Sequence, residues 1–345
     1  MKIVTILFSL LLTSTGPQTK NCVPQTGGQL VIYRAGSLTR AFGPLVETFT
    51  CQTGVQVKDV AMGSVDAGRQ VTAGGQKADL YAPADYLDID LLMKPAGYAD
   101  FNIVFARGKM VLAYSQKSVA EKKLPSIVAP GSPPFRLPDS IPKASDRWYE
   151  ILTMTGVFIG SGHPFLDPGA YRTPLIFQLA AAHYKVANLY NNLLEHVVIP
   201  PADQTGTALG RLFGFQFTYE HNARATAAAN PDYRYVDLPD EIDLSDPAKD
   251  RFYRENAVVA IPGLGTARSP RTVIIPATHV AWGITLLKDA PNRENAIRFL
   301  ELLLGPAGVA SLRENGPAPI TPALVSGESF ARLPRSLQPL VEKTK

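Results

Sequence analysis

The first third of the chain alternates strand-like and helical patterns, and this alternation constrains the fold more than any other feature. Four short apolar runs predict strands, at residues 30–33, 55–60, 78–82 and 110–114. Two helical patterns lie between the first three runs, at residues 42–49 and 64–73. A strand–helix–strand order requires crossover connections, which place the strands parallel in one sheet. The sequence therefore predicts an α/β fold.

A second α/β region follows a proline-rich loop at residues 125–142. Its patterns predict two strands and one long helix, at residues 157–160, 215–219 and 173–195. Near the end of the sequence a further strand and helix are predicted, at residues 279–286 and 292–304. These late elements have no partner sheet of their own, so we expect them to return to the first sheet.

The N-terminal residues have the pattern of a secretory signal peptide. Lys2 precedes an apolar run at residues 3–12, and a small, polar stretch follows at residues 13–17. Such a run is too short to span a bilayer, and this order is typical of a signal peptide. We therefore expect residues 1–20 to be a signal peptide and the mature protein to be periplasmic or extracellular. The alternative is a buried first strand or helix.

Cys22 and Cys51 are the only cysteines in the sequence. In an exported protein such a pair predicts a disulfide, whereas two free thiols are the alternative. Two cysteines this far apart, with no histidine close by, do not form a metal site.

Composition narrows the classes of function. Hydrophobic residues make up 46% of the 345 residues, which is ample for a core, and the formal net charge is +4. No run of lysine and arginine reaches five residues, so no nucleic-acid partner is expected. A small anionic ligand is compatible with this charge.

Two Gly-Ser pairs follow the first two predicted strands, at Gly36-Ser37 and Gly63-Ser64. Such a pair at a strand-to-helix junction leaves backbone N–H groups and a hydroxyl available to an anion. The carboxyl ends of parallel strands meet at one edge of a sheet, where open α/β sheets bind their ligands. The two pairs therefore indicate one binding crevice, although each serine is alternatively only a helix cap.

Two carboxylates lie at the ends of elements in the second region. Asp167 precedes Pro168 in the segment that opens the long helix, and Glu220 follows the strand at residues 215–219. Each also has a purely structural interpretation, with Asp167 as a helix cap and Glu220 as a solvated helix start.

Seven motifs occur in an order that is specific as a set. They are GSLT (36–39), GS (63–64), ADLYAPADY (78–86), FAR (105–107), LDPGAYR (166–172), YE (219–220) and LPDEIDL (238–244). Together they resemble the exported molybdate/tungstate-binding proteins of ABC importers, of the ModA/WtpA type. The last three resemble the WtpA branch in particular, and the resemblance extends over residues 28–325.

The resemblance implies a periplasmic-binding-protein type II fold, a two-lobed clamp with a mixed or parallel sheet in each lobe and two crossing hinge strands. It places lobe 1 at residues 28–110 and 281–325, lobe 2 at 111–280 and a C-terminal tail at 326–345. It also implies a non-catalytic monomer that captures tungstate or molybdate for an ABC permease. No cofactor is expected besides this ligand.

Carried over by position, the ligand-binding residues are expected to be Ser37, Ser64, Asp167, Gly169 and Glu220. The serines would donate from the first lobe by hydroxyl and backbone N–H, and the backbone near Gly169 would add a donor. Asp167 and Glu220 match carboxylates that approach the Mo or W atom of the bound oxyanion.

The chain departs from the family pattern at two places. Pro83 stands where a serine is common, and His221-Asn222 follow Glu220. These departures leave the identity of the oxyanion open.

Two carboxylates beside a dianion also raise a physical problem, because unpaired buried charges repel and are costly. Protonation, coordination to Mo or W, or a different ligand would each resolve it. The alternatives are therefore another, sulfate-like oxyanion or a divalent cation held by Asp167 and Glu220.

A secreted hydrolase that uses Asp167 and Glu220 as acid and base is the alternative from another class. It has little support, because Gly160-Ser161-Gly162 lacks the Gly-x-Ser-x-Gly spacing of a nucleophile elbow. The five histidines include no pair at the spacing of a helical metal site. We therefore expect no enzymatic activity.

Overall fold

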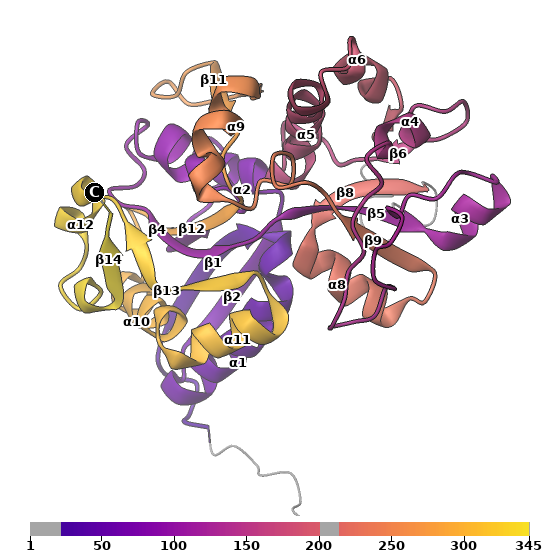
Figure 1. Cartoon of the computed structure of the whole chain (residues 1–345). Helices are drawn as coiled ribbons and strands as arrows, with labels where there is room; N and C mark the ends of the chain where they lie inside the picture. The colour runs from indigo at the N-terminus through magenta and orange to yellow at the C-terminus, as the bar shows by residue number, and fades with distance from the viewer. Residues whose placement is uncertain (1–21, 201–213, 345) are drawn as a thin grey trace, which may run out of the picture.

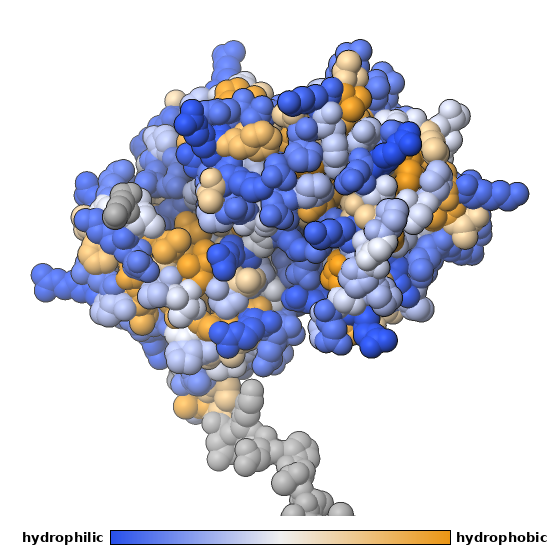
Figure 2. All heavy atoms as spheres, viewed as in Figure 1, coloured by the Kyte–Doolittle hydropathy of each residue, from blue (hydrophilic) through white to orange (hydrophobic). Residues whose placement is uncertain are grey.

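The computed structural model describes residues 22–200 and 214–344 and has two lobes, each built around its own β-sheet (Figure 1). This confirms the predicted two-lobed α/β fold. The face shown in Figure 2 is mainly hydrophilic, with hydrophobic residues in scattered positions. Among the described residues, no helix is both long and apolar enough to cross a bilayer.

The sheet of the first lobe is mixed. Its strands are β1 (Gln29–Ala35), β2 (Gln56–Met62), β3 (Leu80–Ala82), β4 (Ile103–Arg107), β12 (Ala281–Leu286), β13 (Ala318–Val325) and β14 (Val341–Lys343). Their order is β14-β13-β4-β12-β3-β1-β2. The first three predicted strands are β1, β2 and β3, and β1 pairs parallel with both of the others, as expected. Strand β12 runs antiparallel to β3 and β4, and β14, within the expected tail, pairs with β13.

Helices and short turns surround this sheet. They are η1 (Gly36–Leu38), α1 (Thr39–Thr53), α2 (Ser64–Gln70), η2 (Asp88–Met93), α10 (Arg293–Leu304), α11 (Pro306–Asn315), α12 (Gly327–Arg332) and η5 (Gln338–Leu340). The apolar stripe of α1 packs on α10, where the ring of Phe299 lies 5.9 Å from Phe42 and 5.3 Å from Phe49. The late strand and helix, β12 and α10, thus lie in the first lobe.

The second lobe has a five-stranded sheet in the order β7-β6-β8-β5-β9. Strand β5 runs antiparallel to its neighbours β8 and β9. The fourth predicted strand is β5, so it belongs to this sheet and does not extend the parallel set of the first. The elements of this lobe are β5 (Met110–Ser115), α3 (Gln116–Glu121), α4 (Trp148–Leu152), β6 (Ile159–Gly160), α5 (Pro168–Tyr184), α6 (Leu189–Leu194), β7 (Val197–Val198), β8 (Phe215–Tyr219), α8 (Glu220–Ala229) and β9 (Tyr233–Asp237).

The prediction of one long helix over residues 173–195 is wrong at both ends. Helix α5 already begins at Pro168, because proline at the first helical position loses no hydrogen bond. It ends where Lys185 adopts a left-handed backbone, with φ at 56°, and donates its N–H to the Ala181 carbonyl. Asn188 is also left-handed and precedes α6. Two left-handed residues thus divide what the sequence pattern predicts as one helix.

The chain crosses between the lobes beside a buried tryptophan. Gly108 connects β4 to β5, and its N–H donates to the Val280 carbonyl at 2.9 Å. A Cβ at this position would lie 3.0 Å from the Trp282 ring, so the close approach favours glycine. The returning chain runs alongside, since the Met110 N–H donates to the Asp243 carbonyl at 2.8 Å.

A hairpin of β10 (Val258–Pro262) and β11 (Thr272–Pro276) contacts both lobes. It follows η4 (Pro247–Lys249) and α9 (Asp250–Asn256). Gln178 of α5 exchanges two hydrogen bonds with the Val258 backbone, at 2.9 and 3.1 Å. Arg69 of α2 donates to the Pro262 carbonyl at 2.7 Å. Because the hairpin contacts both lobes, these bonds do not assign it to either one. The lobe boundaries at 28–110, 111–280 and 281–325 stay a prediction.

Cys22 and Cys51 form a disulfide, which confirms that prediction. The bond ties the first described residues to α1, and backbone hydrogen bonds extend the attachment. The Val23 N–H donates to the Cys51 carbonyl and the Gly27 N–H to the Gly54 carbonyl, both at 3.0 Å. The expected signal peptide, residues 1–20, lies outside the described residues.

We expect removal of this disulfide to lower the free energy of unfolding by about 3 kcal/mol, because the bond closes a loop with a sequence separation of 29. The double variant Cys22→Ser/Cys51→Ser and the wild type would be compared by urea denaturation. A reducing agent should destabilise only the wild type. Equal midpoints for the oxidised wild type and the variant would contradict the prediction.

Candidate ligand-binding site

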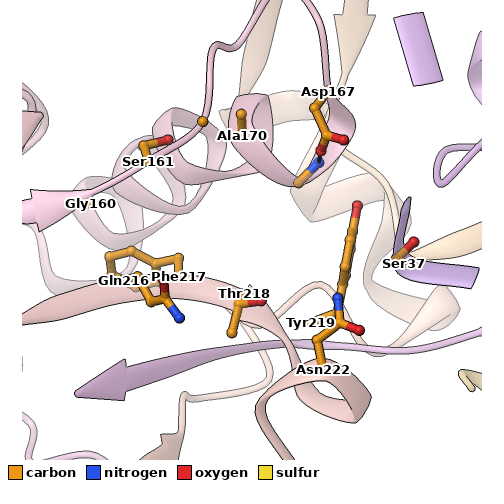
Figure 3. Close-up of a pocket in the computed structure, with 12 residues that line it drawn as sticks. Ser37, Gly160, Ser161, Asp167, Ala170, Gln216, Phe217, Thr218, Tyr219 and Asn222 are labelled. Atoms are coloured by element: carbon orange, nitrogen blue, oxygen red, sulfur yellow. Dashed lines mark hydrogen bonds between the residues drawn. The ribbon is translucent and has the colours of Figure 1, made fainter. Parts of the chain in front are cut away.

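Both lobes contribute to the lining of a cavity of about 340 Å³ (Figure 3). The first lobe supplies Ser37 of η1. The second lobe supplies the loop after β6, the start of α5, strand β8 and the start of α8. Figure 3 shows Asp167, Tyr219 and Ser37 toward one end of the cavity, and Ser161 and Gln216 toward the other. The lining residues are Ser37, Gly160, Ser161, Gly162, Asp167, Gly169, Ala170, Gln216, Phe217, Thr218, Tyr219 and Asn222.

Asp167 both caps α5 and lines the cavity. Its backbone is extended, and its Oδ1 accepts the Gly169 N–H at 2.6 Å. Burial raises the pKa of the Asp167 carboxyl, against the opposing effects of the Gly169 and Ala170 N–H groups and of Arg172. The structural role that the sequence allows for this residue is therefore present, and the side chain lies at the cavity as well.

Ser37 is bound through both its hydroxyl and its carbonyl. The Trp282 Nε1–H donates to Ser37 Oγ at 2.9 Å. His221 Nε2 lies 3.1 Å from the Ser37 carbonyl oxygen. Burial lowers the pKa of His221 to about 4, so the ring is neutral at pH 7 and donates from Nε2. Because His221 belongs to α8, this bond joins the two lobes beside the cavity.

Ser64 is fully buried and lies outside the cavity lining. Its hydroxyl accepts the Ala84 N–H at 2.9 Å. The preceding Gly63 packs against the second lobe, where a Cβ would lie 2.5 Å from the Leu166 carbonyl oxygen and 3.4 Å from Asp167 Cβ. The second Gly-Ser pair thus lies against the loop that carries Asp167.

Glu220 lines a different cavity, of about 230 Å³, together with His221 and the hinge residues 107–109. Its carboxylate lies 3.3 Å from Arg224, one helical turn later, and accepts from the Tyr235 hydroxyl at 3.3 Å. The structure therefore brings Ser37, Asp167 and Gly169 together but leaves Glu220 apart from them. The ligand-binding role of the five expected residues stays a prediction.

Tyr219 lines the cavity, although its motif gave it no separate role. It ends β8 on the same buried face as Phe215 and Phe217, so the alternation predicts a core residue. The structure gives its hydroxyl a partner in Arg172, which donates to it. A hydroxyl on the last residue of the strand is the signal that distinguishes Tyr219 from the two phenylalanines.

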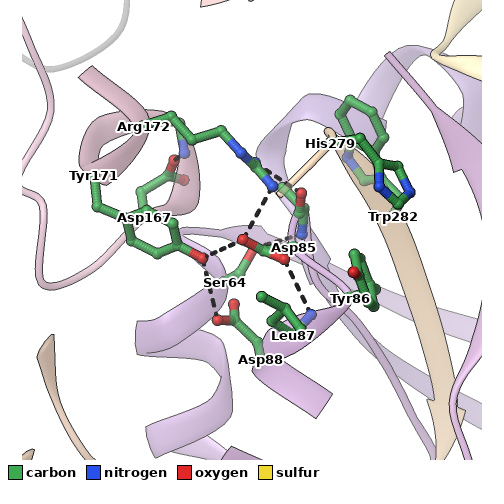
Figure 4. Close-up of polar contacts among 12 residues, drawn as sticks. Ser64, Asp85, Tyr86, Leu87, Asp88, Asp167, Tyr171, Arg172, His279 and Trp282 are labelled. Atoms are coloured by element: carbon green, nitrogen blue, oxygen red, sulfur yellow. Dashed lines mark hydrogen bonds and ion pairs between the residues drawn. The ribbon is translucent and has the colours of Figure 1, made fainter. Parts of the chain in front are cut away.

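Two residues of α5 tie the second lobe to the first (Figure 4). Arg172 lies 3.0 Å from Asp85 Oδ2 and donates to the Ala84 carbonyl at 3.0 Å. The Tyr171 hydroxyl donates to Asp85 Oδ2 at 2.8 Å and lies 3.4 Å from Asp88 Oδ1. All five residues are buried. Because a buried charge is stable only when it is paired, these contacts hold the lobes together.

Arg69 of α2 adds a second cationic contact across the lobes. Its guanidinium donates to the carbonyls of Phe165, Pro262 and Gly263, at 2.8, 2.7 and 3.1 Å. The planar fork of arginine suits several acceptors at fixed angles. The loop before α5 and the β10–β11 hairpin are therefore both tied to the first lobe.

The cavity offers hydrogen-bond donors without a cationic side chain. Its hydroxyl and amide side chains are able to donate, and none of the described lining residues is lysine, arginine or histidine. Within residues 22–200 and 214–344, no group of three or more His, Cys, Asp and Glu side chains could hold a metal ion. The arrangement suits the enclosure of a small polar solute.

A two-lobed α/β clamp with a polar cavity lined from both lobes is the architecture of a solute-binding protein. The chain belongs to the family of bacterial extracellular solute-binding proteins, whose model matches residues 30–317. It is 32% identical to the molybdate/tungstate-binding protein WtpA of Pyrococcus abyssi, over 98% of this chain and 96% of that protein. It is 31% identical to the WtpA protein of Thermococcus kodakarensis, over 91% and 87% of the two chains. The resemblance to the WtpA type is thus confirmed.

Solved structures share the fold at low sequence identity. The sulfate-binding protein SubI from Mycobacterium tuberculosis H37Rv has a TM-score of 0.57 and 16% identity, covering 92% of this chain and 93% of its own. The periplasmic molybdate-binding protein of Azotobacter vinelandii has a TM-score of 0.54 and 15% identity, covering 84% and 98%. Both likenesses support the two-lobed fold.

We expect the stability of the Asp88→Asn variant to increase relative to that of the wild type as the pH rises. Burial, with Asp85 and Asp167 adding to its effect, raises the pKa of Asp88 well above its ordinary value of 3.8, although Arg172 and Tyr171 oppose the shift. The folded wild type therefore loses stability as the pH rises above the ordinary pKa, whereas the neutral amide does not. The difference in unfolding free energy between variant and wild type should shift in the variant's favour from about pH 4 to pH 7.

Denaturant unfolding at both pH values provides the measurement. The matched control is Asp139→Asn at an exposed aspartate of the second lobe, which should show no such shift. A difference for Asp88→Asn that is independent of pH would contradict the prediction.

Proposed function

We propose that this protein is a non-catalytic, exported solute-binding protein that captures tungstate or molybdate and delivers it to the permease of an ABC importer. The observation that carries the proposal is the cavity lined from both lobes, with hydroxyl, amide and backbone donors and no cationic lining side chain. Such donors suit a small oxyanion, which only accepts hydrogen bonds when fully deprotonated. The names of the WtpA relatives support this choice of ligand.

The oxyanion would be held by donors from both lobes. From the first lobe we propose Ser37 and Ser64, of which Ser64 lies outside the cavity lining. From the second lobe we propose the backbone N–H groups at Gly169 and Ala170, which would exchange their present acceptors on Asp167 for the ligand. Ser37, Gly169 and Ala170 all line the cavity. Enclosure by two lobes removes the ligand from water, which strengthens each charge-assisted hydrogen bond. The loaded, closed form would then be what the permease recognises.

The carboxylates are proposed to contact the metal atom of the oxyanion. Asp167 lies at the cavity, and the raised pKa of its carboxyl reflects the cost of an unpaired charge there. Coordination to Mo or W would offset this cost, since the metal atom accepts carboxylate oxygen as a ligand. Glu220 lies at the neighbouring cavity, where its carboxylate contacts Arg224 and Tyr235. To coordinate the metal atom, the carboxylate would have to break these two contacts.

Calorimetric titration of the mature protein tests the proposed function. Tungstate, molybdate, sulfate and Mn²⁺ would be titrated in parallel at one pH and ionic strength. We expect tungstate or molybdate to bind at least tenfold more tightly than sulfate, and Mn²⁺ not to bind. Preferential binding of sulfate or of Mn²⁺ would overturn the proposal in favour of a different oxyanion or of a cation.

The variants Asp167→Asn and Glu220→Gln separate coordination from simple charge. If the carboxylates coordinate the metal atom, each change should weaken tungstate binding about 100-fold or more, which at about 1.4 kcal/mol per tenfold step is about 3 kcal/mol or more. If they only repel the anion, the changes should improve binding of every dianion, sulfate included. Titrations of both variants decide, and tighter tungstate binding by either would contradict coordination.

Matched controls for these variants are Asp139→Asn and Glu195→Gln, at exposed carboxylates of the second lobe. They make the same chemical change away from the cavity. Both should bind tungstate as the wild type does, so a general effect of net charge would be recognised.

A further inference from the structure

We propose that Trp282 is a positioning residue for the oxyanion site, because it fixes the Ser37 hydroxyl so that its proton is available to the ligand. This inference rests on the proposed function. It concerns a residue outside the cavity lining, which would act only through Ser37.

The hydrogen bond between the two residues has one possible direction. The indole Nε1–H can only donate, so at 2.9 Å the Ser37 oxygen must be the acceptor. The hydroxyl has a single proton, which must then point away from the indole. Because Ser37 is a lining residue, this leaves an O–H that can donate into the cavity.

Contacts from both lobes hold the indole in place. Its ring lies 4.9 Å from that of Tyr219 and 5.3 Å from that of His221, both in edge-on arrangements. On the hinge side, a Cβ at Gly108 would lie 3.0 Å from the indole ring. Trp282 itself is fully buried on β12. Such a packed ring has little freedom to turn, so the direction of its N–H is fixed.

The second lobe also holds the backbone of Ser37. His221 of α8 donates to the Ser37 carbonyl at 3.1 Å. Ser37 is therefore bound at its hydroxyl from β12 of the first lobe and at its carbonyl from the second lobe. The bond to the hydroxyl lies within the first lobe, whereas the bond to the carbonyl joins the two lobes, so contact between the lobes fixes the backbone that carries the oriented hydroxyl.

A double-mutant cycle tests whether Trp282 acts through Ser37. Trp282→Phe removes the N–H and keeps an aromatic ring, and it is combined with Ser37→Ala. Sodium tungstate and sodium molybdate are titrated into each protein by calorimetry. Trp282→Phe should weaken binding about 3- to 10-fold, the range of one neutral hydrogen bond. In the Ser37→Ala background it should change binding less than about twofold, because the hydroxyl it orients is absent.

Trp148→Phe is the matched control, since Trp148 is the other tryptophan and donates to Tyr184 in the second lobe at 3.2 Å. It should not change affinity in either background. Equal weakening by Trp282→Phe with and without the Ser37 hydroxyl, or no weakening at all, would overturn the inference. A wild type that binds neither oxyanion would instead overturn the proposed function, and the inference with it.

A spectroscopic measurement covers the case in which Trp282→Phe does not fold. In the Trp148→Phe protein, Trp282 is the remaining tryptophan and its fluorescence reports on the indole alone. Tungstate should shift this emission, and adding Ser37→Ala should reduce the shift at saturating tungstate. An equal shift with and without the hydroxyl would overturn the inference without any change at Trp282.

Discussion

The buried guanidinium of Arg172 is the interaction on which the closed arrangement of the lobes depends. Arg172 belongs to α5 in the second lobe, and its guanidinium contacts Asp85 and the Ala84 carbonyl in the first lobe. The same guanidinium donates a hydrogen bond to the Tyr219 hydroxyl at the cavity. Loss of one partner from a buried pair typically costs about 3–5 kcal/mol, because the other charge is left uncompensated. The same side chain therefore links closure of the lobes to the position of a cavity residue. An arginine suits both tasks because its fork donates in several directions at once.

The parts of the fold that the sequence predicts are those governed by local pattern. The strands β1, β2 and β3 follow from short apolar runs, and their parallel pairing follows from the helices between them. The return of β12 to the first sheet follows from its lack of a partner elsewhere. Prediction fails where single residues act against the pattern. Lys185 adopts a left-handed backbone that its residue type does not indicate, and Asn188, a residue type that adopts this conformation more readily, follows it; together they divide the predicted long helix.

The candidate site, like the fold, can be predicted where it depends on local sequence pattern. Ser37 and Asp167 lie next to element ends, where a glycine or a proline marks the junction in the sequence, and both reach the cavity. Glu220 lies at a strand end too, yet its carboxylate contacts Arg224, one turn along its own helix. An i to i+4 ion pair is visible in the sequence but does not by itself show which partner is preferred. Trp282 could not be predicted, because its role depends on a hydrogen bond between residues 245 positions apart.

Three hydroxyl groups in or beside the candidate site share one arrangement, in which each accepts an N–H from the protein, although Ser64 lies outside the cavity lining. The pairs are Ser37 with Trp282, Ser64 with Ala84, and Tyr219 with Arg172. Since a hydroxyl has one proton, a hydroxyl that already accepts is left to donate. Attraction for an anion would therefore come from oriented neutral dipoles, with the cation Arg172 acting from behind Tyr219. Neutral donors attract a neighbouring carboxylate and do not repel it, which is consistent with the presence of Asp167 at the same cavity. A ligand with a proton of its own would need an acceptor there, and Asp167 is the one carboxylate among the described lining residues.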